Sequence, residues 1–353
     1  MEAPLAQSLA DPLAEGIGAY LLLALELMAA FFIFAIGTLA AVVVVMYFVD
    51  RNQTKQTIRR NYPVIGRFRY LFEHIGEFLR QYFFAMDREE LPFNRAQRAW
   101  VYRAAKNIDS TVAFGSSKDL SRPGNIIFVN TAYPTLDEDA VDTSPLVIGP
   151  DCALPFQARR IVNISGMSYG ALSQPAVRAL SHGAAMAGCW MNTGEGGLSP
   201  YHLEGGADIV FQIGTAKYGV RDDQGRLSDE KLKQVAAKEP VRMFEIKLSQ
   251  GAKPGKGGIL PAAKVSAEIA EIRGIPEGQA SISPNRHPEI RNADDLLDMI
   301  DRVRKITGKP TGIKAVLGAP AWLDELFSAI NQRGELAAPD FITLDSADGG
   351  TGA

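Results

Sequence analysis

The residues of this chain that could carry out chemistry lie in glycine-rich segments. In residues 192–200, NTGEGGLSP, the carboxylate of Glu195 stands between two glycines, so no neighbouring side chain shields it. Such a carboxylate is either a solvent-exposed loop residue or an acid–base group of an active site. The residue spacing alone leaves both interpretations open.

Lysines dominate a second segment, residues 245–261, EIKLSQGAKPGKGGILP. Lys247 and Gln250 follow an apolar run with the length of a buried strand, and Lys253 lies in a loop with four glycines. A surface role in water does not explain why a lysine stands at the end of a buried strand. In a barrel, the side chain of such a lysine would face a cofactor or substrate. Lys314, within TGIKA, repeats this arrangement on a later strand. We therefore expect these side chains to bind a polar or anionic ligand.

Two further segments are rich in small residues, which allow the backbone to approach a flat ring or a phosphate closely. Residues 165–173 read SGMSYGALS, and residues 345–353 read DSADGGTGA. Many turns have this composition, so each segment alone is a weak signal. The candidate cofactor-binding residues in them are Ser165, Met167, Ser168, Gly170, Gly349 and Gly350.

The sequence also excludes several kinds of site and partner. It contains no dinucleotide-binding fingerprint, P-loop or metal-binding histidine spacing, so no metal site is predicted. The two cysteines, Cys152 and Cys189, cannot form a disulfide framework or a three-cysteine iron–sulfur site. The net charge of -3 gives no reason to expect nucleic acid as a partner. The histidines are scattered, and only His202 falls close to Glu195.

Alternating strand and helix patterns after residue 145 must position these segments. Short apolar runs predict strands at 161–164, 190–192, 209–213, 243–247, 312–316 and 341–344. Amphipathic stretches predict helices at 174–187, 262–273, 293–307 and 321–332. This alternation is typical of a parallel sheet with crossover helices, in which catalytic groups lie beyond the carboxyl ends of the strands. The segments described above occupy such positions.

The N-terminal part contains a run of 23 uncharged residues, 27–49, LMAAFFIFAIGTLAAVVVVMYFV. As a helix with a rise of about 1.5 Å per residue, it spans a hydrocarbon core of about 30 Å. No Lys or Arg precedes Arg51, whereas Arg51, Lys55 and Arg59 follow the run closely. Positive charge stays in the cytoplasm, and an acidic leading segment does not fit a secretory signal. We expect a single-pass membrane protein with residues 1–26 outside and the remainder cytoplasmic.

Residues 50–119 are expected to form a helical connecting region. Within it, residues 68–84 place Leu71, Ile75 and Phe78 on one helical face. This face either packs on the main domain or lies on the membrane surface. Asn94 predicts the start of another helix at 95–106.

Together these motifs resemble the flavin-binding barrel of the glutamate synthase family. The similar stretches are ISGMSYGALS, NTGEGGLSPYH, EIKLSQGAKPGKGGILPAAKV and DSADGGTGA, with RPGN at 122–125. The resemblance covers residues 120–353 and extends to short glutamate synthase-related proteins with an N-terminal membrane segment. It implies a (β/α)8 TIM-type barrel that holds FMN, in an oxidoreductase that transfers a hydride to the imine of 2-oxoglutarate, or of an analogue, to give L-glutamate.

The resemblance also implies roles for single residues. Glu195 matches a carboxylate near the substrate and the ammonia path, and Lys253 matches a substrate-binding lysine, so these two are the expected catalytic residues. The expected flavin-side residues are the small-segment candidates named above together with Lys247, Gln250 and Lys314. The cluster cysteines of the family are absent, so the electron donor is unidentified. Ile259 stands where the family often has a polar residue, and a close analogue of 2-oxoglutarate is therefore an alternative substrate.

Two other interpretations stay open at this point. The chain could be a catalytically inactive, membrane-tethered fragment or scaffold. It could also be a barrel enzyme of the inosinate dehydrogenase type, but that chemistry needs a catalytic loop cysteine, and neither Cys152 nor Cys189 lies in such a loop. A closed barrel of this class has eight strands, and only about six are predicted. We therefore expect a barrel that is incomplete at the C-terminus, in a fragment that folds poorly.

Overall fold

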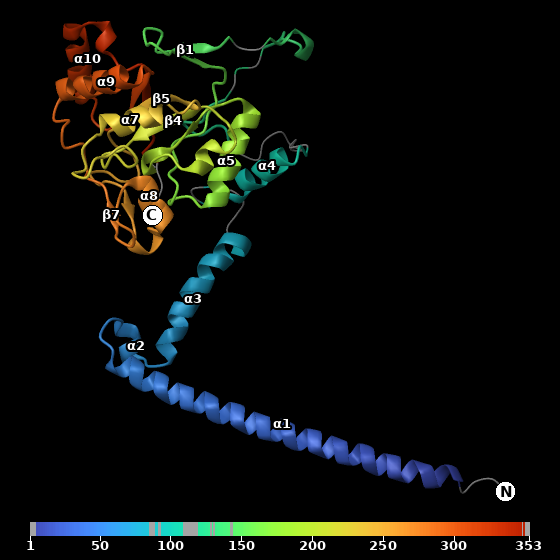
Figure 1. Ribbon diagram of the computed structural model, residues 1–353. Helices are drawn as coiled ribbons and strands as arrows, with labels where there is room; N and C mark the ends of the chain where they lie inside the picture. Colours follow the sequence, from blue (N-terminus) through green and yellow to red (C-terminus); the bar gives the residue numbers. More distant parts are fainter. Residues whose placement is uncertain are drawn as a thin grey trace. The chain divides into compact units, whose positions relative to one another are not determined.

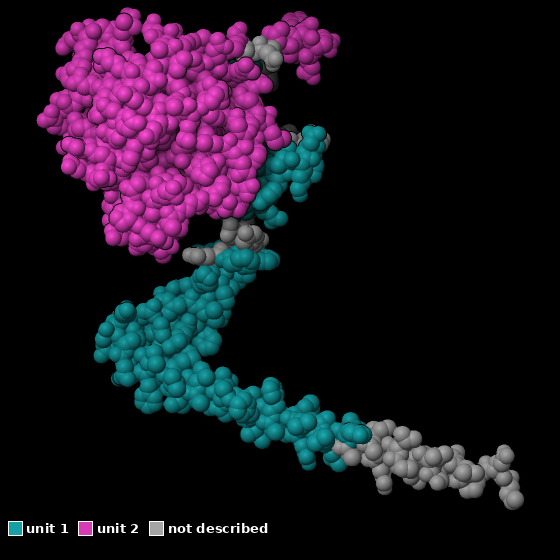
Figure 2. All heavy atoms as spheres, in the orientation of Figure 1, with its two compact units in different colours: residues 1–131 teal, residues 132–353 magenta. Residues whose placement is uncertain are grey.

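The computed structural model describes residues 5–84, 89–90, 93–108, 119–127, 129, 131–141, 144–347 and 349. The chain divides into two compact units, residues 1–131 and residues 132–353, which Figure 2 shows in different colours. Figure 1 shows that the secondary structure in the described part of the first unit consists of helices, whereas the second combines strands and helices.

The first unit contains the predicted helices, with different bounds. They are α1 (Leu5–Asn52), α2 (Thr57–Asn61), α3 (Ile65–Leu79) with a π-helical turn at Arg80–Phe84, and α4 (Arg95–Ala105). Asn94 begins α4 with a capping box, in which its side chain accepts from the N–H of Gln97 and the Gln97 side chain accepts from the N–H of Asn94. Local capping chemistry explains why the start of α4 could be predicted.

A long apolar stretch lies within α1. Tyr20–Asn52 form 33 helical residues, and none of the most apolar window is buried inside the protein. In the part of the chain that the structure describes, this is the one helix long and apolar enough to cross a membrane. The stretch includes the whole of the predicted span at 27–49.

The second unit is built on a parallel five-stranded sheet with the strand order β3-β4-β5-β8-β9. Its strands are β3 (Met191–Asn192), β4 (Ile209–Ile213), β5 (Val241–Lys247), β8 (Thr311–Val316) and β9 (Ile342–Asp345). The curled sheet corresponds to part of a TIM-type barrel. Strand–helix alternation therefore predicted the correct fold class.

The strand predicted at 161–164 is wrong. Only Ile164 pairs with the sheet, through a single parallel bridge to Met191. The side chains of Ile161 and Val162 are 91% and 77% exposed. A short apolar run predicts a buried strand, but the sequence does not show whether another element covers these residues.

Helices accompany the sheet strands along the chain. They are α5 (Gln174–Ala187), α6 (Pro200–Leu203), α7 (Asp229–Ala236), α8 (Ala267–Arg273), α9 (Ala293–Thr307) and α10 (Ala321–Arg333). The predicted ends of α5 and α9 are confirmed, because Gly188 and Gly308 end these helices at φ values of 66° and 70°, which favour glycine. The predicted helix at 262–273 is broken into a 3-10 turn, Ala262–Lys264, and α8, which starts anew at Ala267 because the hydroxyl of Ser266 accepts from the N–H of Ile269 as an N-cap. Helix α7 was not predicted.

Apolar and polar side chains alternate along the strands, so one face of the sheet contributes to the core and the other face is polar. On β5, Phe244 and Ile246 belong to the main core, which also contains Ile300 of α9. Glu245 and Lys247 lie on the opposite face of the same strand, because successive side chains of a strand point to opposite faces. The apolar face binds the helices, and the polar face is left for a site.

Two antiparallel strand pairs, which the sequence did not predict, complete this unit. The first joins β1 (Leu146–Ile148) to β2 (Phe156–Ala158). Its Phe156 packs in a second core with Val210 and Met243, at the ends of the strands remote from the lysines. The second pair joins β6 (Ile259–Leu260) to β7 (Ser281–Ile282), and it holds the glycine-rich loop after β5.

Candidate functional site

A pocket with five charged side chains in its wall lies at the carboxyl ends of the parallel strands. These side chains are Glu195, Lys247, Lys253, Arg273 and Lys314. The cavity has a volume of only about 50 Å³, but an adjoining cavity of about 320 Å³ shares Glu195, Lys247 and Lys253 with it, and small-molecule sites usually measure about 300–1,000 Å³. Ligands of parallel α/β sheets bind at this edge.

Glu195 and Lys247 form an ion pair in this pocket. Oε2 of Glu195 lies 3.1 Å from Nζ of Lys247, and the two side chains are 18% and 11% exposed. Gly214 and Gly258 make room for the carboxylate, since a Cβ atom at either position would collide with Glu195. The carboxylate is therefore a partly buried group of the pocket wall and not a solvated loop residue.

Lys247 is held from two sides. Its ammonium donates to the side-chain carbonyl of Gln250, and its backbone carbonyl lies 2.9 Å from Nε2 of His287. A carbonyl only accepts, so Nε2 of His287 carries the hydrogen and Nδ1 is unprotonated. His287 is 1% exposed, and burial, with the nearby charge of Lys217, lowers its pKa from 6.5 to about 4. A neutral His287 thus fixes the backbone at the end of β5.

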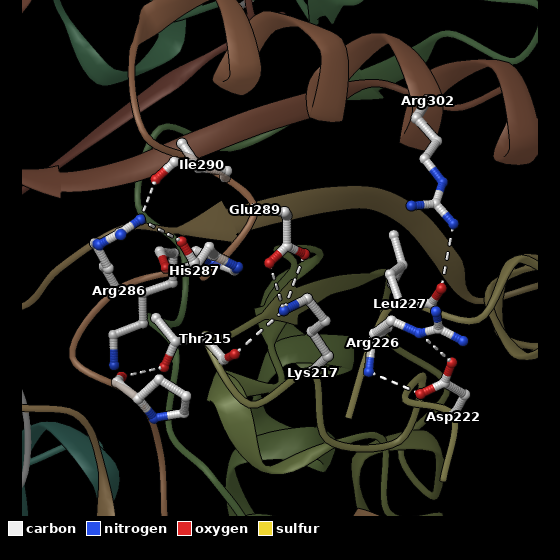
Figure 3. Close-up of polar contacts among 12 residues, drawn as sticks. Thr215, Lys217, Asp222, Arg226, Leu227, Arg286, His287, Glu289, Ile290 and Arg302 are labelled. Carbon is white, nitrogen blue, oxygen red and sulfur yellow. Dashed lines mark hydrogen bonds and ion pairs between the residues drawn. The ribbon is translucent and has the colours of Figure 1, made fainter. Parts of the chain in front are cut away.

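An ion pair between the buried Lys217 and the exposed Glu289 lies beside His287. Figure 3 shows Nζ of Lys217 between the carboxylate oxygens of Glu289, at 2.9 Å from Oε1, and it also donates to the carbonyl of Thr215 at 3.3 Å. Lys217 adopts a φ of 55°, which is uncommon for a residue other than glycine. It directly precedes Tyr218, which lines the pocket. The ion pair therefore fixes an unusual turn that carries a pocket residue.

Arg273 is a site residue that the sequence analysis missed. It is 5% exposed, its Nη2 donates to the carbonyl of Tyr169 at 3.3 Å, and its guanidinium lies 5.0 Å from the ring centroid of Tyr218. Its Nε has no hydrogen-bond partner among the described residues. Burial lowers the pKa of Arg273, but a guanidinium stays charged in a protein. This cation has donors to offer a ligand.

Lys253 is the other cation with free donors. It lines the pocket from the loop after β5 and is half-buried. Within the described ranges, its ammonium makes no hydrogen bond or ion pair with another residue. Lys253 and Arg273 therefore give the pocket two cations that no carboxylate of the described chain neutralises.

Lys314 differs from Lys253, because it is already paired. Its Nζ lies 3.2 Å from Oδ1 of Asp345, and the two side chains are 7% and 12% exposed. The other oxygen of Asp345 accepts from the backbone N–H of Gly251 at 3.0 Å. This ion pair joins the ends of β8 and β9 to the start of the glycine-rich loop.

A buried carboxylate lies on the same face of β5, two residues before Lys247. Glu245 is 2% exposed, and its Oε1 accepts from Asn192 at 2.9 Å and from Gln212 at 2.6 Å. Its Oε2 accepts from the hydroxyl of Thr343 at 2.6 Å. Donors from β3, β4 and β9 thus converge on one carboxylate of β5 and fix the side chains below the pocket.

The other predicted cofactor residues are divided between the pocket and its surroundings. Ser168 and Gln250 line it. Ser165 is exposed and lies outside the lining, as do Met167 and the turn residue Gly170. Gly349 accepts from the N–H of Ala252 at 2.7 Å and also does not line the pocket, and Gly350 lies outside the described residues.

His202 has a structural position. Its Nδ1 accepts from the N–H of Ser199 at 3.1 Å and lies 2.7 Å from the Ser199 hydroxyl, and the ring is completely buried. Burial lowers its pKa from 6.5 to about 4. It does not line the pocket that contains Glu195.

Comparisons with known proteins agree with this architecture. A family model described as the conserved region in glutamate synthase matches residues 117–353. The glutamate synthase large subunit-like protein YerD of Bacillus subtilis is 41% identical over 91% of this chain and 68% of its own length. A glutamate synthase large subunit-like protein of Rhizobium meliloti is 32% identical over 75% of this chain and 57% of its own length.

Another relative, matched over a shorter stretch, is the archaeal-type glutamate synthase (NADPH) of Dehalococcoides mccartyi. It is 35% identical over 54% of this chain, and the match covers 35% of that protein. This chain therefore matches from about a third to two thirds of the length of these relatives. The resemblance inferred from the motifs is confirmed, and the chain belongs to the glutamate synthase family.

Proposed function

We propose that this chain forms part of an FMN-dependent oxidoreductase that reduces the imine of 2-oxoglutarate, or of a close analogue, to L-glutamate. The observation that carries the proposal is the pairing of two kinds of group in one pocket. An ion-paired carboxylate, Glu195, lies beside two cations with unused donors, Lys253 and Arg273. Membership of the glutamate synthase family supports the same reaction class.

Each group has a task that follows from its chemistry. Lys253 and Arg273 bind the carboxylates of a dicarboxylic substrate, because guanidinium and ammonium donors to carboxylates form strong, charge-assisted hydrogen bonds. Ile259 and Leu260 also line the pocket and suit the methylene carbons between these carboxylates. Glu195 is placed to exchange a proton with the imine nitrogen, and Lys247 keeps this carboxylate in position at 3.1 Å.

The chemistry of the pocket residues also suits a flavin ring, and the adjoining cavity of about 320 Å³ shares Lys247 and Gln250 with the pocket. The small residues Gly166 and Ser168 leave its wall open, and Gln250, Lys247 and Lys314 offer polar groups for ring oxygen and nitrogen atoms. FMN, when bound, would supply the hydride that adds to the imine carbon. The role of the protein is then to hold the substrate carbon and the proton donor in a fixed arrangement.

The cofactor can be tested on the intact chain purified in detergent. We expect FMN to be released on acid denaturation and identified by chromatography, at less than one equivalent per chain because the sheet forms only part of a barrel. Lys247→Met should lower the FMN content, because it removes a pocket cation while keeping the side-chain volume. The matched control is Lys233→Met on the exposed face of α7. Release of FAD would contradict FMN as the cofactor, and the absence of any flavin would favour an inactive scaffold.

We also propose that α1 crosses the membrane once, with the N-terminus outside and the second unit in the cytoplasm. The exposed apolar stretch Tyr20–Asn52 and the basic residues that follow it support this topology. In cells that carry a tag at each end of the chain, external protease should remove the N-terminal tag and spare the C-terminal one. Loss of the C-terminal tag from intact cells would overturn this orientation.

A further inference from the structure

The segment after α1 folds into a fixed elbow. Asp50 is completely buried, and its carboxylate lies 2.6 Å from Arg59 of α2 and 2.8 Å from Arg67 of α3. It also accepts from the N–H of Val64 at 3.1 Å. Val64 has a φ of 66°, a conformation that β-branched residues rarely adopt. These contacts fix the start of α3 at the end of α1, and Figure 1 shows α3 turning away from the axis of α1.

Helix α3 exposes an apolar face. Ile65, Phe68, Leu71 and Phe72, which we call the α3 apolar face, are 73%, 53%, 49% and 65% exposed. They are spaced by three or four residues and therefore lie on one side of the helix. The rings of Phe68 and Phe72 stack at a centroid distance of 6.4 Å. A contiguous exposed patch of this kind marks an interaction surface.

Positive charge lies at the elbow end of this face, whereas Glu73, paired with Arg69, follows Phe72 at the other end. Arg51, Lys55 and Arg60 are exposed at the elbow, and no Asp or Glu occurs between Arg51 and Arg69. The preceding carboxylate, Asp50, is occupied by its two arginine partners. The elbow cations are therefore available to negatively charged groups, and anionic lipid headgroups attract clusters of this kind next to a membrane helix.

We propose that α3 lies along the cytoplasmic surface of the bilayer, with the α3 apolar face at the boundary between headgroups and acyl chains. The elbow cations Arg51, Lys55 and Arg60 bind anionic headgroups. This inference rests on the proposed membrane crossing of α1, and it is independent of the catalytic proposal. A bilayer fits this surface better than a protein partner does, because the apolar face begins where α1 ends and has cations at its elbow end.

Site-specific fluorescence tests the proposal on the full chain in vesicles. Cys152→Ser and Cys189→Ala remove the native thiols, and Phe72→Cys or His74→Cys then carries an environment-sensitive probe. His74 is the matched control. It follows Phe72 by two residues and therefore lies on the opposite, polar side of α3. In phosphatidylglycerol vesicles we expect the probe at position 72 to be shifted to the blue and quenched by nitroxide-labelled lipids. The probe at position 74 should remain accessible to a water-soluble quencher.

Each other outcome contradicts a defined part of the inference. Flotation with the vesicles reports on α1 separately, so a failure of membrane crossing is distinguished from a failure of α3 to bind. Equal quenching at positions 72 and 74 would overturn the surface orientation. A blue-shifted probe that nitroxide lipids do not quench would mean that protein covers the face. Identical results in phosphatidylcholine vesicles, or at high salt, would show that the elbow cations do not bind anionic headgroups.

Discussion

Arg273→Met or Lys253→Ala is expected to weaken the binding of 2-oxoglutarate by about 100-fold, or about 2.7 kcal/mol. Arg273 is buried with an unpartnered Nε, and Lys253 makes no ion pair with any residue the structure describes. Each cation therefore gains its carboxylate partner only when the substrate binds. A bound carboxylate left without such a partner loses the strongest class of hydrogen bond.

Calorimetric titration of the detergent-purified chain, with FMN measured in the same sample, would check this result. Lys264→Ala is the matched control, because Lys264 is exposed and lines neither this pocket nor the adjoining cavity. Arg273→Lys keeps a cation and should recover part of the affinity. Wild-type affinity in both neutral variants would show that the substrate binds elsewhere.

Glu195 should behave differently from the two cations. Glu195→Gln keeps the shape of the side chain but removes its charge and its ability to exchange a proton. We expect turnover to fall far more than affinity, because this group is needed for the proton transfer. An equal loss of affinity and turnover would instead assign Glu195 to substrate binding.

Much of the fold was predictable because its signals are local. The strands at 209–213 and 312–316 are apolar runs of normal strand length, and α5 and α9 end at glycines whose conformation only glycine adopts easily. The β1–β2 and β6–β7 pairs are only two or three residues long, so they have no period to detect. At Ile161 and Val162 a strand was predicted where none forms, because two adjacent apolar residues indicate a buried strand although both are exposed here.

The site was predictable where a residue stood at the end of a strand or between glycines. This rule found Glu195, Lys247 and Lys314, all of which line the pocket. This rule missed Arg273, because an arginine followed by a glycine is common at the end of a helix. Its position is therefore interpreted as part of a helix C-terminus. The rule also missed Glu245, because its partners come from three other strands, and only the folded sheet brings them together.

Acidification from pH 7 to pH 5 is expected to destabilise the second unit through its buried histidines. His202 and His287 each have a folded-state pKa of about 4, because burial opposes their charged form, against 6.5 for an ordinary histidine. Between about pH 6.5 and about pH 4, these two histidines therefore bind protons in the unfolded chain but not in the folded chain. The stabilisation is complete above this window and is lost as the pH falls through it. Each histidine should contribute a loss of about 2 kcal/mol between pH 7 and pH 5.

His287→Gln isolates one of these contributions. The glutamine amide can still donate to the carbonyl of Lys247, as Nε2 of His287 does, but it does not titrate. Urea unfolding of the full chain in detergent, followed by tryptophan fluorescence, should show a smaller difference between pH 7 and pH 5 in this variant. His182→Gln is the surface control, since its ring is exposed. Carboxylates remote from the substituted histidines titrate alike in all three proteins, so their effect cancels; Glu204 beside His182 and Glu289 near His287 are the exceptions. If His287→Gln loses as much stability on acidification as the wild type, then His287 is not held neutral in the folded protein.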